Sequence, residues 1–380
     1  MEPRVVSETT VSPRSTSFQC SNCSKDEAEN TCSKCNAVKY CSRECQKDHW
    51  KNHKSYCNEI KKLIKKVEKE AKPLREYEEC GRVRNLFEDS VGHFWGLLDP
   101  RNYCRVRYDL CFALLKCAMN NNSKLALELS LEHMLDLACL NRTDNIGIRF
   151  FIPGVLCALD EMQEAYDFLK WWLVGDHGAL YDWRNVQPPY WNLKDEDIFE
   201  DLSMVLPVKR FVMLDVHFLV SLFFLKYKVM MKLEEEKSSY GTFLLGTNPR
   251  VGGDSPIRKL RGVAVVLQAI KHFVSPNSNK KNKMKDQLEE LVKRVDKGNK
   301  YLIPGLLNSA PLLIQKAPDF TSSGCQNGAY SIVDAESLNW RTAPGIHSYM
   351  KELYVGLHGN EKAEENIAEL PKVKVEYDYY

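Results

Sequence analysis

The sequence has almost no excess of charge of either sign. Its 53 Lys and Arg residues are matched by 51 Asp and Glu residues, which leaves a net charge of +2 at pH 7. A chain this close to neutrality is not expected to bind a polyanion through its overall charge.

Long apolar segments are also absent. No uninterrupted apolar run reaches the ~18 residues that a membrane-spanning helix needs, so we expect no membrane partner. The most apolar segment, residues 211–231, is interrupted by Asp215, His217, Lys226 and Lys228. We expect it to form a buried helix with His217 as a core residue. Residues 1–17 lack the apolar segment of a signal peptide and are predicted to be a disordered tail, which favours an intracellular protein of the nucleus or the cytoplasm.

Motifs of catalysis are missing as well. The sequence contains no nucleophile elbow, no paired-carboxylate motif and no HExxH, so we predict that the protein is not an enzyme. The length of 380 residues and the hydrophobic content of 44% predict two or three folded units with true cores.

The 14 cysteines are, in contrast, concentrated at one place. Seven lie between Cys20 and Cys57, and the others are scattered through apolar segments, where we expect small buried side chains. Clustered thiols in a reducing compartment bind metal more often than they form disulfides. We therefore predict a metal site, with a disulfide framework as the alternative.

The spacing within the cluster supplies ligands for two ions. Two C-x2-C knuckles each aim two sulfurs at one ion, and two further pairs are spaced four residues apart, on one face of a helical turn. The eight ligands in chain order are Cys20, Cys23, Cys32, Cys35, Cys41, Cys45, His53 and Cys57. Thiolates with one imidazole favour zinc, so we predict two structural Zn²⁺ ions.

The length of the last ligand segment limits how these residues pair. If residues 42–57 are helical, Cys45 and Cys57 are about 18 Å apart and cannot share an ion. An interleaved arrangement satisfies this limit. Its two sets are Cys20, Cys23, Cys41 and Cys45 for one ion, and Cys32, Cys35, His53 and Cys57 for the other.

With its ligands in this order, the segment resembles the MYND zinc finger. The knuckles, the Tyr40–Cys41 pair, and Trp50 before His53 all agree with that family, which uses the same interleaved, cross-brace pairing. His49 also lies four residues from Cys45 and from His53. The family spacing selects His53, so we expect His49 to be an exposed residue that binds no metal.

The resemblance also implies a partner. Related fingers bind extended proline- and leucine-containing peptides, which add as a strand beside the hairpin of the finger. The matching candidates in this sequence are Ser42, Gln46 and Trp50. In the alternative interpretation, Ser42 only caps the helix, Gln46 is solvated and Trp50 packs on the zinc core.

The remainder of the chain is predicted to be mainly α-helical. The expected organisation is a finger at residues 18–58, a charged helical linker at 59–99, a repeat-like helical domain at 100–320, and an irregular C-terminal region with a disordered tail at 321–380. Residues 142–159 and 160–172 resemble the two helices of a tetratricopeptide repeat, with Ala165 at the contact between helices. We expect the helical domain to fold without zinc.

These features predict an adaptor that binds protein partners through a proline-containing motif. The first alternative is a lysine methyltransferase, because MYND fingers also occur in SET-domain enzymes. It is disfavoured by the helical pattern and by the absence of the Asn-His-x-Cys-x-Pro-Asn-like cofactor motif. The second is a nucleic-acid-binding regulator. No base-reading helix stands out, and Asp26, Glu27 and Glu29 interrupt the basic surface of the finger.

Overall fold

The computed structural model describes residues 17–175, 182–183, 185, 190–206, 212–244, 279–308 and 324–368. The expected disordered tails, up to residue 16 and from residue 369 onward, lie outside these residues. The chain divides into two compact units, one of Met1–Leu159 with Asp176–Asn192 and one of Asp160–Gly175 with Leu193–Tyr380. Each unit is described by itself.

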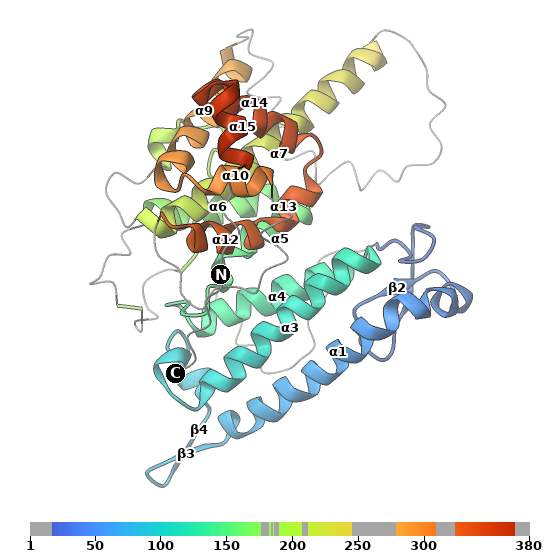
Figure 1. Ribbon diagram of the computed structural model, residues 1–380. Helices are drawn as coiled ribbons and strands as arrows, with labels where there is room; N and C mark the ends of the chain where they lie inside the picture. Colours follow the sequence, from blue (N-terminus) through green and yellow to red (C-terminus); the bar gives the residue numbers. More distant parts are fainter. Residues whose placement is uncertain are drawn as a thin grey trace. The chain divides into compact units, whose positions relative to one another are not determined.

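The first unit begins with a short hairpin and a very long helix (Figure 1). Strands β1 (Asn30–Thr31) and β2 (Lys39–Tyr40) pair antiparallel, and helix α1 follows at Arg43–Arg75. Buried side chains recur along α1 at the three- and four-residue spacing of an amphipathic helix, at positions Ile60, Leu63, Val67, Ala71 and Leu74. This face packs along the next long helix, α3 (Pro100–Asn121).

The expected boundary after residue 58 is therefore wrong. Residues 59–75 are not a linker, because they continue the helix that carries His53 and Cys57 and belong to the same compact unit. Pro73 lies in the last turn of this helix.

Helices α3 and α4 (Lys124–Leu140) form a hairpin that is tied to the zinc-binding segment. Asn122 ends α3 in a left-handed conformation, with φ 46°, and Ser123 caps α4. The Ser123 hydroxyl also donates to the carbonyl oxygen of Ala37, 2.7 Å away, between the second knuckle and β2. The metal-binding segment thus shares a core with a helical hairpin more than 80 residues further along the chain.

Shorter elements complete the first unit. They are β3 (Tyr77–Glu79) and β4 (Arg82–Arg84), which form a hairpin, α2 (Leu86–Asp89), η1 (Phe94–Gly96), η2 (Ile148–Phe150) and α5 (Ile152–Ala158). The tetratricopeptide-like pairing is not confirmed, because α5 belongs to this unit and the following helix, α6 (Met162–Val174), to the other. The first helix of the expected repeat is also short, since Asp144 accepts the N–H groups of Ile148 and Arg149 and holds the preceding residues in a loop.

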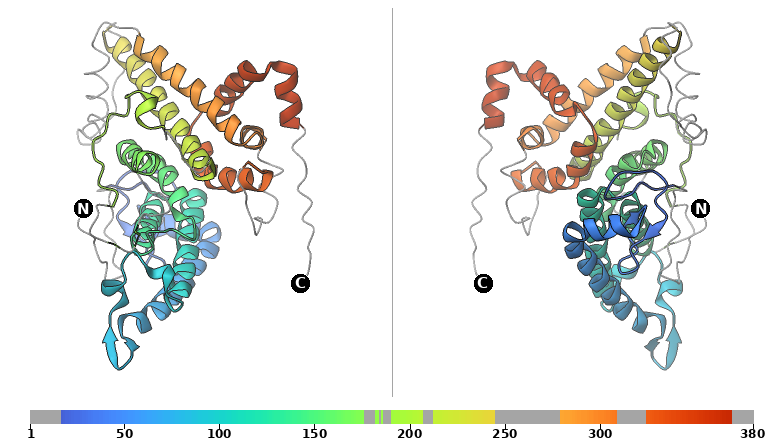
Figure 2. Two further views of the ribbon diagram at one scale, coloured as in Figure 1. Left: turned by 90° about the vertical axis from the view of Figure 1, so that its left-hand side faces the viewer. Right: turned by 90° about the vertical axis from the view of Figure 1, so that its right-hand side faces the viewer.

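The second unit contains a long helix, α7 (Val212–Leu244), in the segment where a buried helix was expected. From Val216 to Met230 every side chain except Lys228 is buried, including that of His217. Helix α9 (Asn279–Gly298) lies beside α7 (Figure 2), and α6 also packs on it.

The C-terminal part of this unit corrects the expectation of an irregular region. Its described residues, 324–368, form α12 (Gln326–Ala335), α13 (Ser337–Thr342), α14 (Ile346–His358) and α15 (Asn360–Ala368). Buried residues at a four-residue spacing, Ile346, Met350 and Tyr354, form the inner face of α14, while α10 (Leu302–Leu307) contacts α12, α14 and α15. Gly345 and Gly359 lie at the two ends of α14, whereas Gly328, Ser331, Ser348 and Gly356 are accommodated within helices, so these residues do not prevent helix formation.

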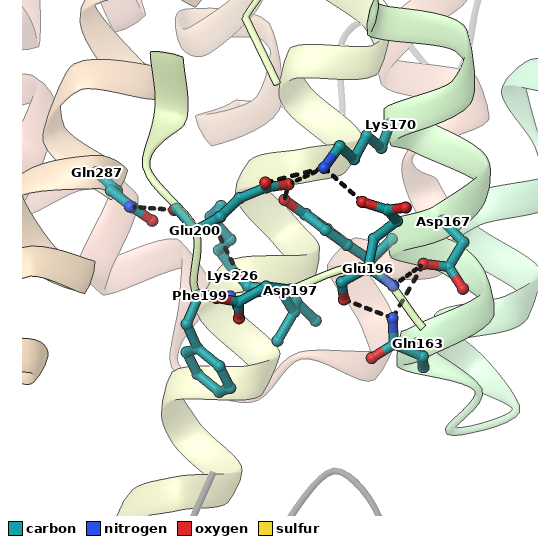
Figure 3. A network of polar contacts seen from close by, with 11 residues as sticks. Gln163, Asp167, Lys170, Glu196, Asp197, Phe199, Glu200, Lys226 and Gln287 are labelled. Atoms are coloured by element: carbon teal, nitrogen blue, oxygen red, sulfur yellow. Dashed lines mark hydrogen bonds and ion pairs between the residues drawn. The ribbon is translucent and has the colours of Figure 1, made fainter. Parts of the chain in front are cut away.

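A polar network fixes the acidic loop at residues 195–200 within the second unit (Figure 3). Asp167 of α6 accepts the backbone N–H groups of Asp195 and Glu196, at 2.9 and 3.0 Å, and Lys170 pairs with Glu196 and Glu200. From α7, the ammonium group of Lys226 donates to the carbonyl oxygen of Ile198, at 2.9 Å. The network joins the loop to two helices through charge-assisted hydrogen bonds.

None of the helices in the described ranges is both long and apolar enough to cross a membrane. All 14 cysteines lie in these ranges and none of them forms a disulfide bond, which rules against the disulfide alternative. Most of the scattered thiols are buried as expected, but Cys80 is exposed at the tip of the β3–β4 hairpin.

Candidate metal centre

The first ligand set joins a knuckle to the start of α1. Cys20, Cys23, Cys41 and Cys45 have ligand atoms that lie within 4.8 Å of one another. Cys41 follows β2 directly, and Cys45 lies in the first turn of α1. This set is partly open to solvent, since Cys23 is exposed and the side chains of Cys41 and Cys45 are only half-buried.

The second set joins the other knuckle to the middle of α1. Cys32, Cys35, His53 and Cys57 also place their ligand atoms within 4.8 Å of one another. All four side chains are buried, with at most 2% of their surface exposed. The thiol of Cys117, on α3, is near enough to this set to be affected by the charge of Cys57 and Cys32, so the helical hairpin contributes to its cover.

The two knuckles have the same local geometry. In each, the residue after the second cysteine donates its N–H to the carbonyl of the first cysteine at 2.8 Å, from Ser24 to Cys20 and from Asn36 to Cys32. Ser24 and Asn36 both adopt a left-handed conformation, with φ of 57° and 56°. Short polar residues tolerate this conformation, so each turn closes and directs its two sulfurs to one side.

The distances between ligand atoms fit tetrahedral zinc. With Zn–S near 2.3 Å and Zn–N near 2.05 Å, a regular tetrahedron has S···S edges of about 3.8 Å and S···N edges of about 3.6 Å. The Sγ atoms of Cys23 and Cys41 are 3.5 Å apart, as are those of Cys41 and Cys45. In the second set the sulfurs of Cys32 and Cys57 are 3.8 Å apart, and His53 Nε2 lies 3.4 Å from Cys35 Sγ.

Electrostatics also favour a cation in each ligand set. A hydrogen bond from Cys35 lowers the pKa of Cys32 to about 3, and the same contact raises the pKa of Cys35 far above the ordinary thiol range. In the first set, hydrogen bonding to Cys45 raises the pKa of Cys41 to about 12. Sulfur atoms at this separation cannot all ionise without an added positive charge, which Zn²⁺ supplies in each set. The donor sets therefore fit two zinc ions, one in each.

His49 belongs to neither set, as expected, but it is not exposed. Its side chain is 6% exposed, and its Nδ1 lies 3.1 Å from the hydroxyl oxygen of Tyr40. The ring also stacks on that of His53, with centroids 6.2 Å apart. The four-residue spacing, which made His49 resemble a ligand, places its ring in the finger core, between Tyr40 and the ligand His53.

The candidate peptide-binding residues lie along one side of the start of α1. Ser42 caps the helix by accepting the N–H of Cys45 at 3.2 Å. Among the described residues none hydrogen-bonds the side chain of Gln46, which is half-buried. Trp50 is half-buried as well, with its ring against His53 and the Lys34 ammonium 5.7 Å from its centroid. Ser42 and Trp50 thus have structural roles, and both retain some exposed surface.

One main-chain edge of the hairpin has no hydrogen-bond partner among the residues that the structure describes. Cys32 donates to Val38 inside the hairpin, so the alternating pattern of an antiparallel ladder turns the main-chain groups of Thr31 and Lys39 outward. The outward carbonyl of Lys39 accepts the N–H of Ser21 at 3.0 Å. Among the described residues, none hydrogen-bonds the outward main-chain groups of Thr31, whose side chain is exposed. Asn30 links this edge to the residues just before α1, because its Nδ2 donates to the carbonyl of Cys41.

Two buried groups that the sequence did not single out as functional have shifted pKa values. Burial lowers the pKa of Lys226 to about 8 and raises the pKa of Glu336 to about 7. Such shifts often mark functional groups. Here both side chains are at most 1% exposed, and Glu336 is hydrogen-bonded to Ser221 and Asn339. The lysine and the glutamate therefore act as core polar residues.

Comparison with known proteins identifies the metal-binding segment. Residues 20–57 match the family of MYND fingers, which are in general protein–protein interaction modules. No curated protein and no solved structure matches the chain. The match and the two ligand sets confirm the expected small cross-brace zinc finger joined to predominantly α-helical structure. Residues 20–57 are a MYND finger with two zinc sites, followed by a mostly helical region.

Proposed function

We propose that the protein is a non-enzymatic adaptor whose finger binds a proline-containing peptide of a partner protein. The observation that carries this proposal is the main-chain edge at Thr31, which has no partner among the described residues. Asn30 links it to Cys41, directly before the segment that holds Ser42, Gln46 and Trp50. A peptide added as a strand gains affinity from main-chain hydrogen bonds and specificity from a few side chains.

Each candidate has a distinct part in this binding. The Thr31 N–H and carbonyl pair with the peptide backbone. Gln46 offers a side-chain amide, and the exposed part of the Trp50 indole offers an apolar surface for a proline ring. The helical units then act as a scaffold that presents the finger or binds further partners.

Two features support the non-enzymatic part of the proposal. Each zinc ion would have four protein ligands, and a closed site lacks the open position that a catalytic zinc keeps. The region after the finger is helical within the described residues, whereas a SET domain is rich in β-structure. A methyltransfer assay with S-adenosylmethionine and lysine-containing peptides should give no product; methylated peptide would refute this part.

The binding part is tested on the full-length, zinc-loaded protein with an arrayed set of ten-residue peptides that carry proline at defined positions. Thr31→Pro is the sharpest variant. It removes an N–H that points away from the hairpin, so the hairpin should persist while the peptide is deprived of a hydrogen bond. We expect Thr31→Pro and Gln46→Ala each to weaken binding about tenfold, with zinc content unchanged.

Lys47→Ala is the matched control, because Lys47 is an exposed neighbour on another side of the same helical turn. It should bind the selected peptides as the wild type does. If Thr31→Pro and Gln46→Ala also bind as the wild type does, or if no peptide binds, the finger is a structural element and the adaptor surface must lie on the helical units.

A further inference from the structure

Helix α1 concentrates positive charge that the near-neutral totals of the chain conceal. It contains eleven Lys and Arg residues against five Asp and Glu residues, whereas the whole chain has 53 against 51. Nine of these lysines are exposed, and we call them the lysine stripe: Lys47, Lys51, Lys54, Lys61, Lys62, Lys65, Lys66, Lys69 and Lys72.

The stripe lies on one side of the helix. At 3.6 residues per turn, the nine lysines fall within an arc of about 140° that runs for about 37 Å. The buried residues, including Leu63 and Val67, occupy the opposite side and pack on α3. From Lys51 onward, the acidic residues of α1 fall outside the arc; they are Glu59, Glu68 and Glu70.

The lysines of the stripe have few close acidic partners among the described residues. In the part of the chain that the structure describes, none of the nine lysines forms an ion pair, and the ion pair of α1 joins Arg75 to Glu68 at 2.6 Å. Lysines three and four residues apart on a helix repel one another by a few tenths of a kcal/mol per pair. A helix face that only contacts water needs no such concentration of positive charge, and a mixture of acidic and basic residues would make the helix more stable.

We propose that the lysine stripe binds the phosphate backbone of double-stranded DNA without reading its sequence. The lysines are spread across the whole arc, with Lys54, Lys61 and Lys72 toward one edge and Lys62 and Lys66 toward the other. Extended lysine side chains place these edges about 10–12 Å apart, which is close to the width of the major groove, where phosphates line both sides.

The geometry fits this partner better than two others of the same charge. A flat anionic membrane meets mainly the centre of the arc. The apolar side chains of α1 that would insert into lipid are buried against α3. An extended acidic peptide carries its charges along a single line, so it would contact the lysines along one edge of the arc only. Lysine also suits non-specific binding, because its ammonium group is a mobile point charge without the fixed fork of arginine.

The test uses the full-length, zinc-loaded protein and two 20-base-pair DNA duplexes of unrelated sequence, followed by fluorescence anisotropy at several salt concentrations. The stripe variant is Lys54→Gln, Lys61→Gln, Lys65→Gln and Lys72→Gln. The control variant removes the same charge from exposed positions of α4 and α9: Lys124→Gln, Lys285→Gln, Lys293→Gln and Lys297→Gln. Zinc content and helical circular dichroism should match the wild type in both variants.

We expect the wild type to bind both duplexes equally. Neutralising about five phosphates would give a slope of about −4.5 in log Kobs against log salt concentration. The stripe variant should bind at least tenfold more weakly, with the slope reduced by about 0.9 for each phosphate that is no longer neutralised, and the control variant should bind as the wild type does. Equal weakening in both variants, absence of DNA binding, or equal or tighter binding to vesicles with 30% phosphatidylserine or to polyglutamate would each overturn the proposal.

Discussion

Replacing Ser123 by alanine tests whether the finger and the helical hairpin fold as one unit. The Ser123 side chain is 5% exposed, and its hydroxyl serves two partners at once. Its oxygen accepts the N–H of Ala126 at 3.3 Å, which caps α4, and its hydrogen is donated to the carbonyl of Ala37 at 2.7 Å, two residues after the zinc ligand Cys35. One side chain therefore joins the second zinc site to the α3–α4 turn.

The expected destabilisation has two parts. Removing an N-cap costs about 1 kcal/mol. The buried carbonyl of Ala37 is then left without its partner, which costs about 1–3 kcal/mol more. The free energy of unfolding of Ser123→Ala should accordingly fall by about 2–4 kcal/mol, measured by urea unfolding of the full-length zinc-loaded protein with helical circular dichroism as the signal.

Zinc retention is the second measurement, and two further variants separate the contributions. Because the broken hydrogen bond lies next to Cys35, the variant should also release zinc faster to a competing chelator. Ser123→Asn keeps an acceptor for the cap and an N–H donor for Ala37, so most of the stability should return. Asn85→Ala removes a cap of similar kind from α2, where Asn85 accepts the N–H of Phe87, and should cost about 1 kcal/mol without a change in zinc release.

The reasoning is refuted if Ser123→Ala is destabilised by less than about 1 kcal/mol and releases zinc like the wild type. In that case the finger is an independent module. The helical region would then fold without zinc, as the dispersed thiols of the sequence suggested.

Two other predictions concern the zinc sites and the second core. A chelator should remove two zinc ions per chain in two phases. The first ion should leave the set with the exposed Cys23, and the second should leave the set whose four ligands are buried. Release of one ion per chain, or a single phase of release, would contradict the arrangement. Burial raises the pKa of Glu336 from 4.5 to about 7. Between these pH values the unfolded state releases a proton that the folded state keeps. The free energy of unfolding should therefore fall by up to about 3 kcal/mol as the pH rises through this range. Glu336→Gln cannot ionise and should flatten the pH profile of urea unfolding between pH 5 and 8, whereas a variant profile parallel to the wild type would exclude Glu336 as the cause.

The zinc ligands could be predicted from the sequence because their geometry is local. The two-residue spacing of a knuckle and the four-residue spacing of a helical pair determine which sulfurs meet. His49 was correctly left out of the ligands, but its expected exposure was wrong, because its ring packs beside Tyr40. Burial of His49 depends on a strand that precedes it, and no pattern within the helix reports that contact.

The organisation after the finger was harder to predict because it depends on contacts between distant residues. The hydrogen bond from Ser123 to Ala37 joins residues 86 positions apart, and no sequence pattern around either residue predicts it. A signal did exist for the continuation of α1, since Ile60, Leu63 and Val67 recur at helical spacing, but the surrounding lysines favoured a solvated linker. The helical face of α14, with Ile346, Met350 and Tyr354, was likewise present and was outweighed by glycines and serines nearby.

The continuity of α1 between Cys57 and Leu63 constrains how this chain can vary or be cut. An insertion of one residue there would rotate the rest of the helix by about 100°, so that either the zinc ligands or the α3-facing residues would point the wrong way. Natural variants should therefore conserve the length of this segment more strictly than its composition. A finger excised at residue 58 would also be deprived of the cover of α3 over its buried zinc site. Such a fragment would expose an apolar edge that captures proteins non-specifically.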